Sequence, residues 1–328
     1  MQADYLIIGS GIAGTLLSYE LILKGKSVIV IDDNSTQNAS TVAGAVLNPV
    51  NIKQWNLAID YGQYISQALH TYESLQALLN IPVISEIPVI VFNDDAGKKN
   101  DAVATYIHPL SAEETKLTTT CFSSNSFLKK ITPSWQIHSI TLLSAWKKHL
   151  LSKSSFISGH FDAREVNFSK HSVVYKNISA EKIIFCEGAS GINNLFFTDA
   201  PFTRNRGEAL LLSIPELPQH NIYHSSIRLV PTNDQLFWCG SNYIWNYTNL
   251  DAGLEWQKQT VIKLKQWLKL PFTIEKHIVA ERPTTAGQKP LMLVHDQLPA
   301  AMFNGLGTRG FLIAPLLAKQ FAEKLTDI

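Results

Sequence analysis

Apolar residues near the start of the chain follow two different spacings. Tyr5 to Ile8 is a short, continuous apolar run, which indicates a buried strand, and leucines at helical spacing follow it. Gly25 predicts the end of that helix, and Val28 to Ile31 forms a second apolar run. The order strand, helix, strand predicts a βαβ unit whose two strands are parallel.

Both spacings recur further along the chain, but no other tandem βαβ units follow. Helical periodicity is found in Leu57 to Leu79, in "ITLLSAWKKHLL", in Leu254 to Leu268 and in a last helix that runs to Leu325. Strand patterns are found in "EIPVIVFN", "VVYKNISAEKIIF", "GEALLLSI", "IRLVP", "LFWCG", "IEKHIVAERP" and Ala301 to Phe303. Residues Asp94 to Pro133 are polar, which predicts a loop-bearing excursion rather than a separate domain. Together these elements predict an α/β fold in which an antiparallel sheet interrupts a parallel one.

The turn between the first strand and the first helix carries the sequence "GSGIAG". Gly9 permits a tight turn, Gly11 lets the backbone approach a pyrophosphate, and Gly14 lets the helix pack closely on the strand. Asp32, 18 residues after Gly14, stands where an acid accepts a hydrogen bond from a ribose hydroxyl, and Asp33 stands where NADP enzymes often have arginine. The predicted dinucleotide site consists of Gly9, Gly11, Ile12, Ala13, Gly14, Asp32 and Asp33.

A second G-x-G-x-x-G lies near the C-terminus, in "NGLGTRGFLIAP", and consists of Gly305, Gly307 and Gly310. A strand precedes it and a helix follows, but neither a second strand nor a downstream acid completes the pattern. We therefore expect no second dinucleotide site at this place. Pro315 is compatible with the first turn of the last helix, where a backbone N–H group needs no helical partner.

Composition narrows the choice of partner and compartment. The 328 residues carry a net charge of +1 and no long Lys/Arg run, which weighs against nucleic acid as the substrate. The first strand follows the N-terminus without a basic, cleavable leader, so a cytoplasmic location is expected. Glycine and polar residues interrupt the apolar stretch Tyr5 to Leu23, so it does not predict a membrane span. The three cysteines form no C-x-x-C and the ten histidines no H-E-x-x-H, and neither disulfides nor a metal are expected.

Several segments, taken in their order and spacing, resemble the D-amino-acid oxidase and glycine oxidase superfamily of FAD-dependent oxidoreductases. They are "GSGIAG" with Asp32, "STVAGAVLNP", "KIIFCEGAS", "RGEALLL", "RLVPTNDQLFWCG", "AERPTTAGQKP" and "NGLGTRGFLIAP", and they extend over most of the chain. The last segment is most similar to the flavin domain of the bacterial tRNA methylaminomethyl-uridine biosynthesis enzymes.

The resemblance implies two interleaved domains. An FAD-binding Rossmann-like domain of the glutathione-reductase type would comprise residues 1–85, 135–205 and 275–328. An antiparallel-sheet substrate domain would comprise residues 86–134 and 206–274.

By the same resemblance, FAD lies extended between the two glycine-rich segments. Its pyrophosphate would lie at "GSGIAG", and backbone N–H groups at a helix N-terminus near Gly307 would face the pyrimidine edge of its isoalloxazine ring. Other residues that match the family's cofactor contacts are Ala43, Gly44, Ala45, Gly188, Gly305, Gly307, Thr308, Arg309, Gly310 and Phe311. No cysteine lies near the "AERP" segment, so non-covalent FAD is expected.

On the substrate side, Arg282 in "AERP" matches the arginine that holds the substrate carboxylate in amino-acid oxidases, a task that suits a planar guanidinium. Arg228 stands where several relatives have tyrosine, which indicates a second anion contact or a different substrate. Glu187 stands where relatives usually have a small residue, and the sequence offers no reason for it. Candidate pocket walls are Trp55, Tyr243 and Trp245.

The implied reaction is oxidation of the C–N bond of a small amino acid or N-substituted glycine by hydride transfer to flavin N5. Arg282 and Arg228 are the candidate catalytic residues, and the electron acceptor is oxygen or another compound. One alternative is oxidation of the glycine-like arm of a modified tRNA uridine, against which the near-neutral charge weighs. Another is a non-catalytic binding protein on a flavoprotein fold, which the intact glycines at both ends disfavour.

Overall fold

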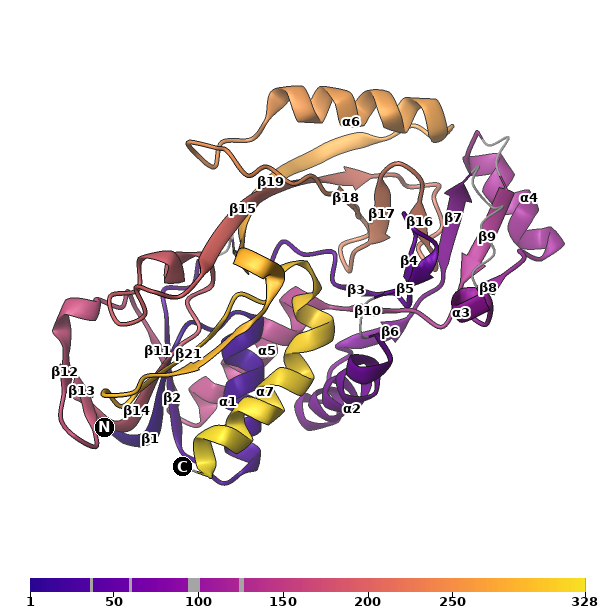
Figure 1. The fold of residues 1–328 in the computed structure, drawn as a ribbon. Coiled ribbons are helices and arrows are strands. Elements are labelled where there is room, and N and C mark those ends of the chain that lie inside the picture. Colours follow the sequence, from indigo (N-terminus) through magenta and orange to yellow (C-terminus); the bar gives the residue numbers. More distant parts are fainter. Residues whose placement is uncertain (36–37, 59–60, 94–100, 124–126, 328) are drawn as a thin grey trace.

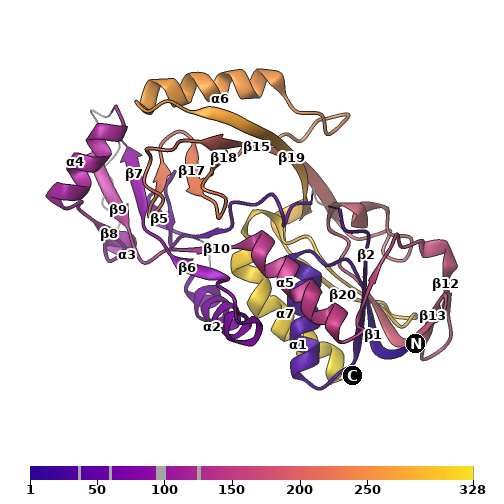
Figure 2. The same cartoon turned by 180° about the vertical axis from the view of Figure 1, so that it is seen from behind.

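The computed structural model of the chain describes residues 1–35, 38–58, 61–93, 101–123 and 127–327. Two eight-stranded sheets dominate these residues, and the chain passes between them several times (Figure 1). Both termini lie in the part that contains the first sheet, as Figure 2 shows from behind. Among the helices that the structure describes, none has both the length and the apolar character that a membrane span requires.

The first sheet contains the βαβ unit. In spatial order its parallel strands are β11 (Phe156–Ser158), β2 (Val28–Asp32), β1 (Gln2–Ile8) and β14 (Ile178–Phe185), with β21 (Ala300–Asn304) beside the end of β14. Antiparallel additions are β20 (Leu291–Val294) on β21, and β13 (Val173–Tyr175) with β12 (Val166–Phe168) beside the start of β14. β1 and β2 are parallel neighbours joined by α1 (Ile12–Leu23), so the βαβ prediction is confirmed.

Helices cover one face of this sheet. α1, α5 (Ser139–Ser152) and α7 (Gly310–Thr326) lie there, and α2 (Tyr61–Leu79) packs against α7 (Figures 1 and 2). Their apolar side chains share a core with the strand residues that point to the same side. The other face packs against the β12–β13 hairpin and against phenylalanines of the segment that follows β14. Where both faces are buried, the parallel strands are wholly apolar, as in Tyr5–Ile8, Val28–Ile31 and Ile183–Phe185, which is why these stretches stand out in the sequence as continuous runs.

The second sheet is mostly antiparallel, in the spatial order β19, β15, β18, β17, β16, β7, β9, β8. Its strands are β19 (Thr273–Thr285), β15 (Phe202–Ser213), β18 (Phe237–Gly240), β17 (Arg228–Pro231), β16 (Ile222–His224), β7 (Val89–Asn93), β9 (Phe127–Ile131) and β8 (Ile107–His108). α6 (Leu254–Trp267) and the end of α4 (Ala112–Cys121) close its outer face through an apolar core. Its inner face turns toward the first sheet (Figure 1).

Short strands lie where the two large sheets meet. β3 (Val46–Leu47), β10 (Trp135–Ile137) and β6 (Ile84–Glu86) form one small sheet, and β4 (Val50–Asn51) pairs with β5 (Asn56–Leu57). In the part of the chain that the structure describes, the remaining helical elements are α3 (Asp101–Ala104) and four 3-10 helices, η1 (Ala163–Glu165), η2 (Gly188–Asn193), η3 (Ala286–Gln288) and η4 (Gly307–Arg309).

The elements predicted for two segments differ from the structure. The helix expected from Leu57 begins at Tyr61, because Asn56 and Leu57 pair with β4; residues 59–60 lie outside the described residues. The polar segment 94–133 holds α3, β8, α4 and β9 in its described parts, whereas residues 94–100 and 124–126 lie outside them. β9 pairs along the length of β7, and a capping box of Ser111 and Glu114 begins α4. Local caps and edge pairing thus form elements that an overall polar composition does not reveal.

Pro315 lies inside α7 rather than in its first turn, because α7 begins at Gly310. A proline at this place donates no hydrogen bond to the carbonyl oxygen of Phe311, four residues earlier. The hydroxyl of Tyr72, on α2, donates to that oxygen over 2.7 Å. Tyr72 is fully buried, and burial raises its pKa well above the usual value, so the hydroxyl stays a neutral donor. Tyr72 therefore supplies the hydrogen bond that Pro315 removes from the helix.

We expect Tyr72→Phe to lower the free energy of unfolding by about 1–2 kcal/mol, because the buried Phe311 carbonyl would lose its donor. In a Pro315→Ala background the same change is expected to cost less, because alanine supplies a helical N–H group to that carbonyl. Chemical unfolding of the wild type, both single variants and the double variant measures this coupling. An equal cost in both backgrounds would mean that the Tyr72 hydroxyl does not replace the N–H group that Pro315 lacks.

Candidate cofactor and substrate site

A cavity of about 590 Å³ lies between the two sheets and is lined by residues from both. The first sheet contributes the β1–α1 turn, the end of β2 and the segment after β14, and the second contributes the inner face of β15, β17, β18 and β19. Most predicted site residues line it: Gly9, Gly11, Ile12, Ala13, Asp32, Asp33, Ala43, Gly44, Ala45, Gly188, Arg228, Arg282, Gly307, Thr308, Arg309, Gly310 and Phe311. Gly14 and Gly305 do not line the cavity, although their neighbours in sequence do. Segments distant in sequence thus meet at one site.

The β1–α1 turn accepts only glycine at two positions. Gly9 has φ +99°, and a Cβ atom there would lie 2.4 Å from the carbonyl oxygen of Cys186. A Cβ atom on Gly14 would lie 1.9 Å from the carbonyl oxygen of Gly9, so the first turn of α1 packs directly on the glycine turn. Gly14 therefore lets the first turn of α1 pack closely on the glycine turn.

The N-terminus of α1 opens onto the cavity. No acid stands in its first turn, and its N-cap residue, Gly11, provides no side-chain cap. The N–H of Ile12 donates to Ser40 Oγ at 2.9 Å, whereas the N–H groups of Gly11, Ala13 and Gly14 have no hydrogen-bond partner among the described residues. Open N–H groups at the positive end of a helix form an anion site, which fits a pyrophosphate.

Two carboxylates at the end of β2 border the same part of the cavity. Asp32 accepts hydrogen bonds from the N–H groups of Ser10 and Asn34, both at 2.7 Å, through different oxygens. Asp33 accepts from the N–H of Ser35 at 2.9 Å. The backbone therefore holds both carboxylates in place beside the glycine turn, where a ribose hydroxyl would be recognised.

The second glycine-rich segment leads into the start of α7. Gly305 and Gly307 have φ +69° and +62°, a left-handed conformation that favours glycine, and η4 then runs directly into α7. No acid stands in the first turn of α7, which packs beside α1: a Cβ atom on Gly310 would lie 3.7 Å from Ile12 Cγ2. Two helix N-termini thus point their positive ends at one cavity.

Trp238, on β18, is a cavity wall that the sequence did not single out. Its indole N–H donates to the carbonyl oxygen of Val42 at 2.9 Å. Its ring rests on two glycines, because Cβ atoms on Gly44 and Gly240 would lie 3.1 Å and 2.9 Å from ring atoms. The small residues of the segment Ala43 to Ala45 therefore also make room for this indole.

Glu187 and Gly188 follow β14 at the edge of the glycine turn. Gly188 has φ +58°, and its carbonyl oxygen accepts a hydrogen bond from Asn304 Nδ2 at 2.9 Å. Glu187 accepts from Asn194 Nδ2 at 2.7 Å, and burial raises the pKa of its carboxyl above the usual value. The Asn194 contact explains how this carboxyl is held but not why a carboxyl stands there.

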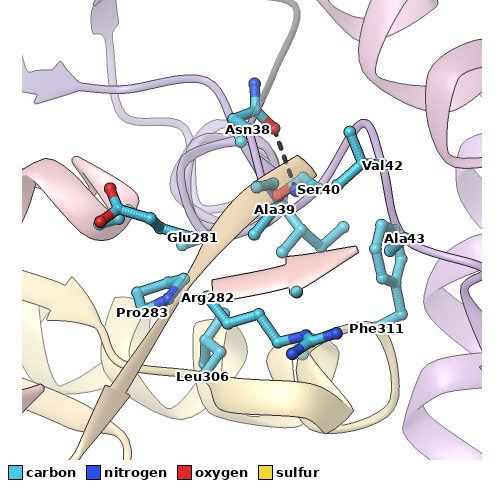
Figure 3. Close-up of a pocket in the computed structure, with 18 of the residues that line it drawn as sticks. Asn38, Ala39, Ser40, Val42, Ala43, Glu281, Arg282, Pro283, Leu306 and Phe311 are labelled. Carbon is cyan, nitrogen blue, oxygen red and sulfur yellow. Dashed lines mark hydrogen bonds between the residues drawn. The ribbon is translucent and has the colours of Figure 1, made fainter. Parts of the chain in front are cut away.

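Arg282 extends from β19 into the cavity, where Ala43, Leu306 and Phe311 also lie (Figure 3). Its Nη1 donates to Asn205 Oδ1 at 2.8 Å and to the Asn242 carbonyl oxygen at 3.1 Å. Its Nη2 donates to Ser241 Oγ at 2.7 Å. These acceptors are neutral, so they orient the guanidinium without cancelling its charge.

Two neighbours shape the space around Arg282. A Cβ atom on Gly207 would lie 2.3 Å from Arg282 Nη2, so the guanidinium lies directly over this glycine. The Tyr243 ring lies with its centroid 4.6 Å from Arg282 Cζ, a cation–π contact. Burial lowers the pKa of Arg282, but a guanidinium stays charged, and no carboxylate pairs with it among the described residues. The cavity therefore presents an oriented cation that an anionic ligand would complete.

Not every aromatic candidate belongs to the site. Trp55 is buried in a separate apolar cluster, and Trp245 is 57% exposed and does not line the cavity, so Tyr243 is the one of the three that does. Arg206 is structural, because it pairs with the buried Glu208 at 3.2 Å. Among the described residues, no group of three or more His, Cys, Asp or Glu side chains could hold a metal ion.

The fold and the cavity define a class of protein: a nucleotide-binding α/β domain whose site is closed by the inner face of an antiparallel sheet. A profile of the family described as "FAD dependent oxidoreductase" matches residues 4–324 of the chain. The chain belongs to this family, the D-amino-acid oxidase family, and is an FAD-dependent oxidoreductase. The predicted fold class, family and cofactor are confirmed.

Solved structures with this fold share little sequence with the chain. Iminodiacetate oxidase from Chelativorans sp. BNC1 is 16% identical, with a TM-score of 0.77, over 98% of this chain and 95% of that one. Glycine oxidase from Geobacillus kaustophilus is 14% identical, with a TM-score of 0.79, over 99% and 95%. L-alpha-glycerophosphate oxidase from Mycoplasma pneumoniae, with FAD bound, is 15% identical, with a TM-score of 0.73, over 100% and 95%. These enzymes are named for three different substrates, so the shared fold does not choose one.

Proposed function

We propose that this enzyme oxidises the C–N bond of a small amino acid or N-substituted glycine. The observation that carries the proposal is Arg282, whose guanidinium is oriented by three neutral acceptors and has no carboxylate partner among the described residues. A carboxylate is the ligand that such a planar cation binds best. The substrate is thus expected to carry a carboxylate close to its reacting carbon.

The residues around the cavity fit FAD. We assign the pyrophosphate to the open N–H groups of Gly11, Ala13 and Gly14, the ribose to Asp32, and the flavin ring to the N-terminus of α7 near Gly307. In this assignment residues 1–85, 135–205 and 275–328 form the FAD-binding domain and residues 86–134 and 206–274 the substrate domain, and Arg282 of the FAD-binding domain reaches the substrate. The positive end of α7 would favour the negative charge of a reduced flavin.

Bound FAD supplies the chemistry by accepting a hydride from the carbon next to the substrate's nitrogen. The chain's residues act by positioning: Arg282 fixes the carboxylate, which sets the place of the carbon attached to it. Trp238 and Tyr243 are walls of the same cavity. The substrate reacts with its amine deprotonated, so its lone pair forms the imine as the C–H bond breaks. Water then hydrolyses the imine, and no side-chain base is required.

The proposal is tested by anaerobic bleaching of the purified holoenzyme's flavin absorption. Glycine, sarcosine, D-alanine and proline are compared with their carboxamides, which keep the amine and lose the carboxylate charge. We expect at least one acid to bleach the flavin and its amide to react far more slowly. Bleaching by carboxymethylaminomethyl-uridine alone would support the tRNA alternative instead, and equal reaction of acids and amides would overturn the role of Arg282. Oxygen uptake with the reactive acid, compared with dye reduction, identifies the electron acceptor.

A further inference from the structure

Arg228, at the start of β17, is a second cation at the cavity for which the proposed reaction provides no partner. Its Nε–H donates to His224 Nδ1 at 3.2 Å. Among the described residues, its guanidinium makes no other hydrogen bond and no ion pair. Arg228 is partly buried and lines the cavity. Its two terminal nitrogens are therefore available to a ligand.

The contact with His224 orients Arg228 but does not neutralise it. Burial, with help from Arg228 and Lys53, lowers the pKa of His224 to about 3, so the imidazole is uncharged near neutral pH. A neutral imidazole accepts the Nε–H through Nδ1 and leaves the charge of the guanidinium uncancelled. Keeping an uncompensated cation away from water is unfavourable unless an anion completes the site. The arrangement is thus built to bind an anion.

Arg228 and Arg282 belong to the same face of the second sheet. Arg228 pairs with Gly240 across β17 and β18, and the next residue, Ser241, holds Arg282 through its hydroxyl. Electrostatic interaction with Tyr243 reaches both guanidinium groups. Both arginines also line the same cavity, so they border a single binding space.

We propose that Arg228 binds a second carboxylate of the substrate, so that the enzyme acts on amino acids or N-substituted glycines that carry two carboxylate groups. The inference rests on the proposed function, in which Arg282 holds the carboxylate nearest the reacting carbon. Two carboxylates compensate two guanidinium groups, whereas a monocarboxylate leaves Arg228 without an anion. The second carboxylate takes no part in bond breaking, so its effect lies in binding.

The first test compares substrates that differ by one charge. Iminodiacetate is paired with its monoamide, and D-aspartate with D-asparagine, because each amide has nearly the shape of its acid. With the wild-type holoenzyme we expect the diacid of the reactive pair to have a KM on the order of 30-fold lower than its amide, with a similar kcat. Equal KM values within a pair would overturn the inference.

The second test removes the charge of Arg228. Arg228→Gln is expected to raise the KM of the diacid on the order of 30-fold and to leave that of the monoamide within about threefold. Arg228→Lys keeps the charge and is expected to restore part of the preference, with flavin absorption and melting temperature reporting that both variants fold and bind FAD. An equal loss for diacid and monoamide would mean that both arginines hold one carboxylate, which contradicts the proposal.

A binding measurement on the wild type needs no variant and no turnover. Glutarate and glutaramate have no amine and cannot be oxidised at a C–N bond, and their binding is followed by the shift of the flavin absorption bands. Tighter binding of glutarate supports the anion site at Arg228, and equal binding overturns it.

If monoacids bleach the flavin and no diacid does, the proposed function stands and the role of Arg228 in binding a second carboxylate is wrong. If no acid of either kind bleaches it, the proposed reaction fails, and the titration alone decides whether Arg228 binds an anion.

Discussion

Arg282→Ala is expected to lower kcat/KM for carboxylate substrates on the order of 1,000-fold while FAD stays bound. The variant removes an oriented, buried cation whose hydrogen bonds to Asn205, Ser241 and Asn242 fix it in the cavity. The loss of a charge-assisted contact to a desolvated carboxylate is the largest single effect that we expect on the substrate side. Stopped-flow reduction of the flavin under anaerobic conditions measures it, with the flavin spectrum before mixing as the check on cofactor content.

A second variant moves Arg282 without removing it. Gly207→Ala would place a Cβ atom 2.3 Å from Arg282 Nη2, and a flexible side chain yields more easily than the backbone. We expect this variant to fold normally and to weaken substrate binding in the same direction as Arg282→Ala. Arg164→Ala is the matched control for Arg282→Ala, because Arg164 is 82% exposed, pairs with Asp162 and does not line the cavity. Unchanged substrate affinity in Arg282→Ala would refute the carboxylate role.

How far the sequence predicts this protein depends on how local each feature is. The βαβ unit could be predicted because strand, turn and helix are contiguous, and each has its own signal: an apolar run, a glycine pattern and helical spacing. The position of Asp32 beside the glycine turn could be predicted because Asp32 directly follows the second apolar run. The second glycine-rich segment could be distinguished from a dinucleotide site for the same reason. The second strand and the acid that it lacks would have followed it closely in sequence.

Features that depend on tertiary contact could not be predicted in this way. Trp238 becomes a wall only because Gly44, far away in sequence, leaves room for its ring. Glycine is needed at position 207 because Arg282 of the neighbouring strand lies over it. Nothing in the segment "RGEALLL" indicates that another side chain comes so close. Trp55 and Trp245 look like Tyr243 in sequence, but one is in a core cluster and the other does not line the cavity. Aromatic type alone does not say which side chain meets a cavity.

The two glycine-rich segments have one physical function in common. Each turns the chain so that a helix begins at the cavity without an acidic residue in its first turn, and the two helices pack side by side. Two positive helix ends at one cavity suit a ligand with separated anionic parts, which is the charge distribution of FAD with its pyrophosphate and its reduced ring. One extended ligand would therefore account for the repeated pattern.

The closest backbone contact in the first of these segments gives the strongest stability prediction. We expect Gly14→Ala to destabilise the protein by more than about 3 kcal/mol and to abolish FAD binding. Its Cβ atom would lie 1.9 Å from the Gly9 carbonyl oxygen, so α1 would have to move away from the turn. Displacing α1 also displaces the open N–H groups of Gly11 and Ala13. The readouts are the FAD-to-protein absorbance ratio and the midpoint of urea unfolding.

Gly62→Ala is the matched control, because Gly62 is also near the start of a helix, α2, and a Cβ atom there would meet nothing within 4 Å. This variant is expected to bind FAD normally and to gain up to about 1 kcal/mol, since alanine favours a helix over glycine. Both variants add the same methyl group near the start of a helix. The difference in their stability and FAD binding therefore reports the lack of space around Gly14. Wild-type FAD affinity in Gly14→Ala would mean that the close packing of α1 on Gly9 is not what forms the pyrophosphate site.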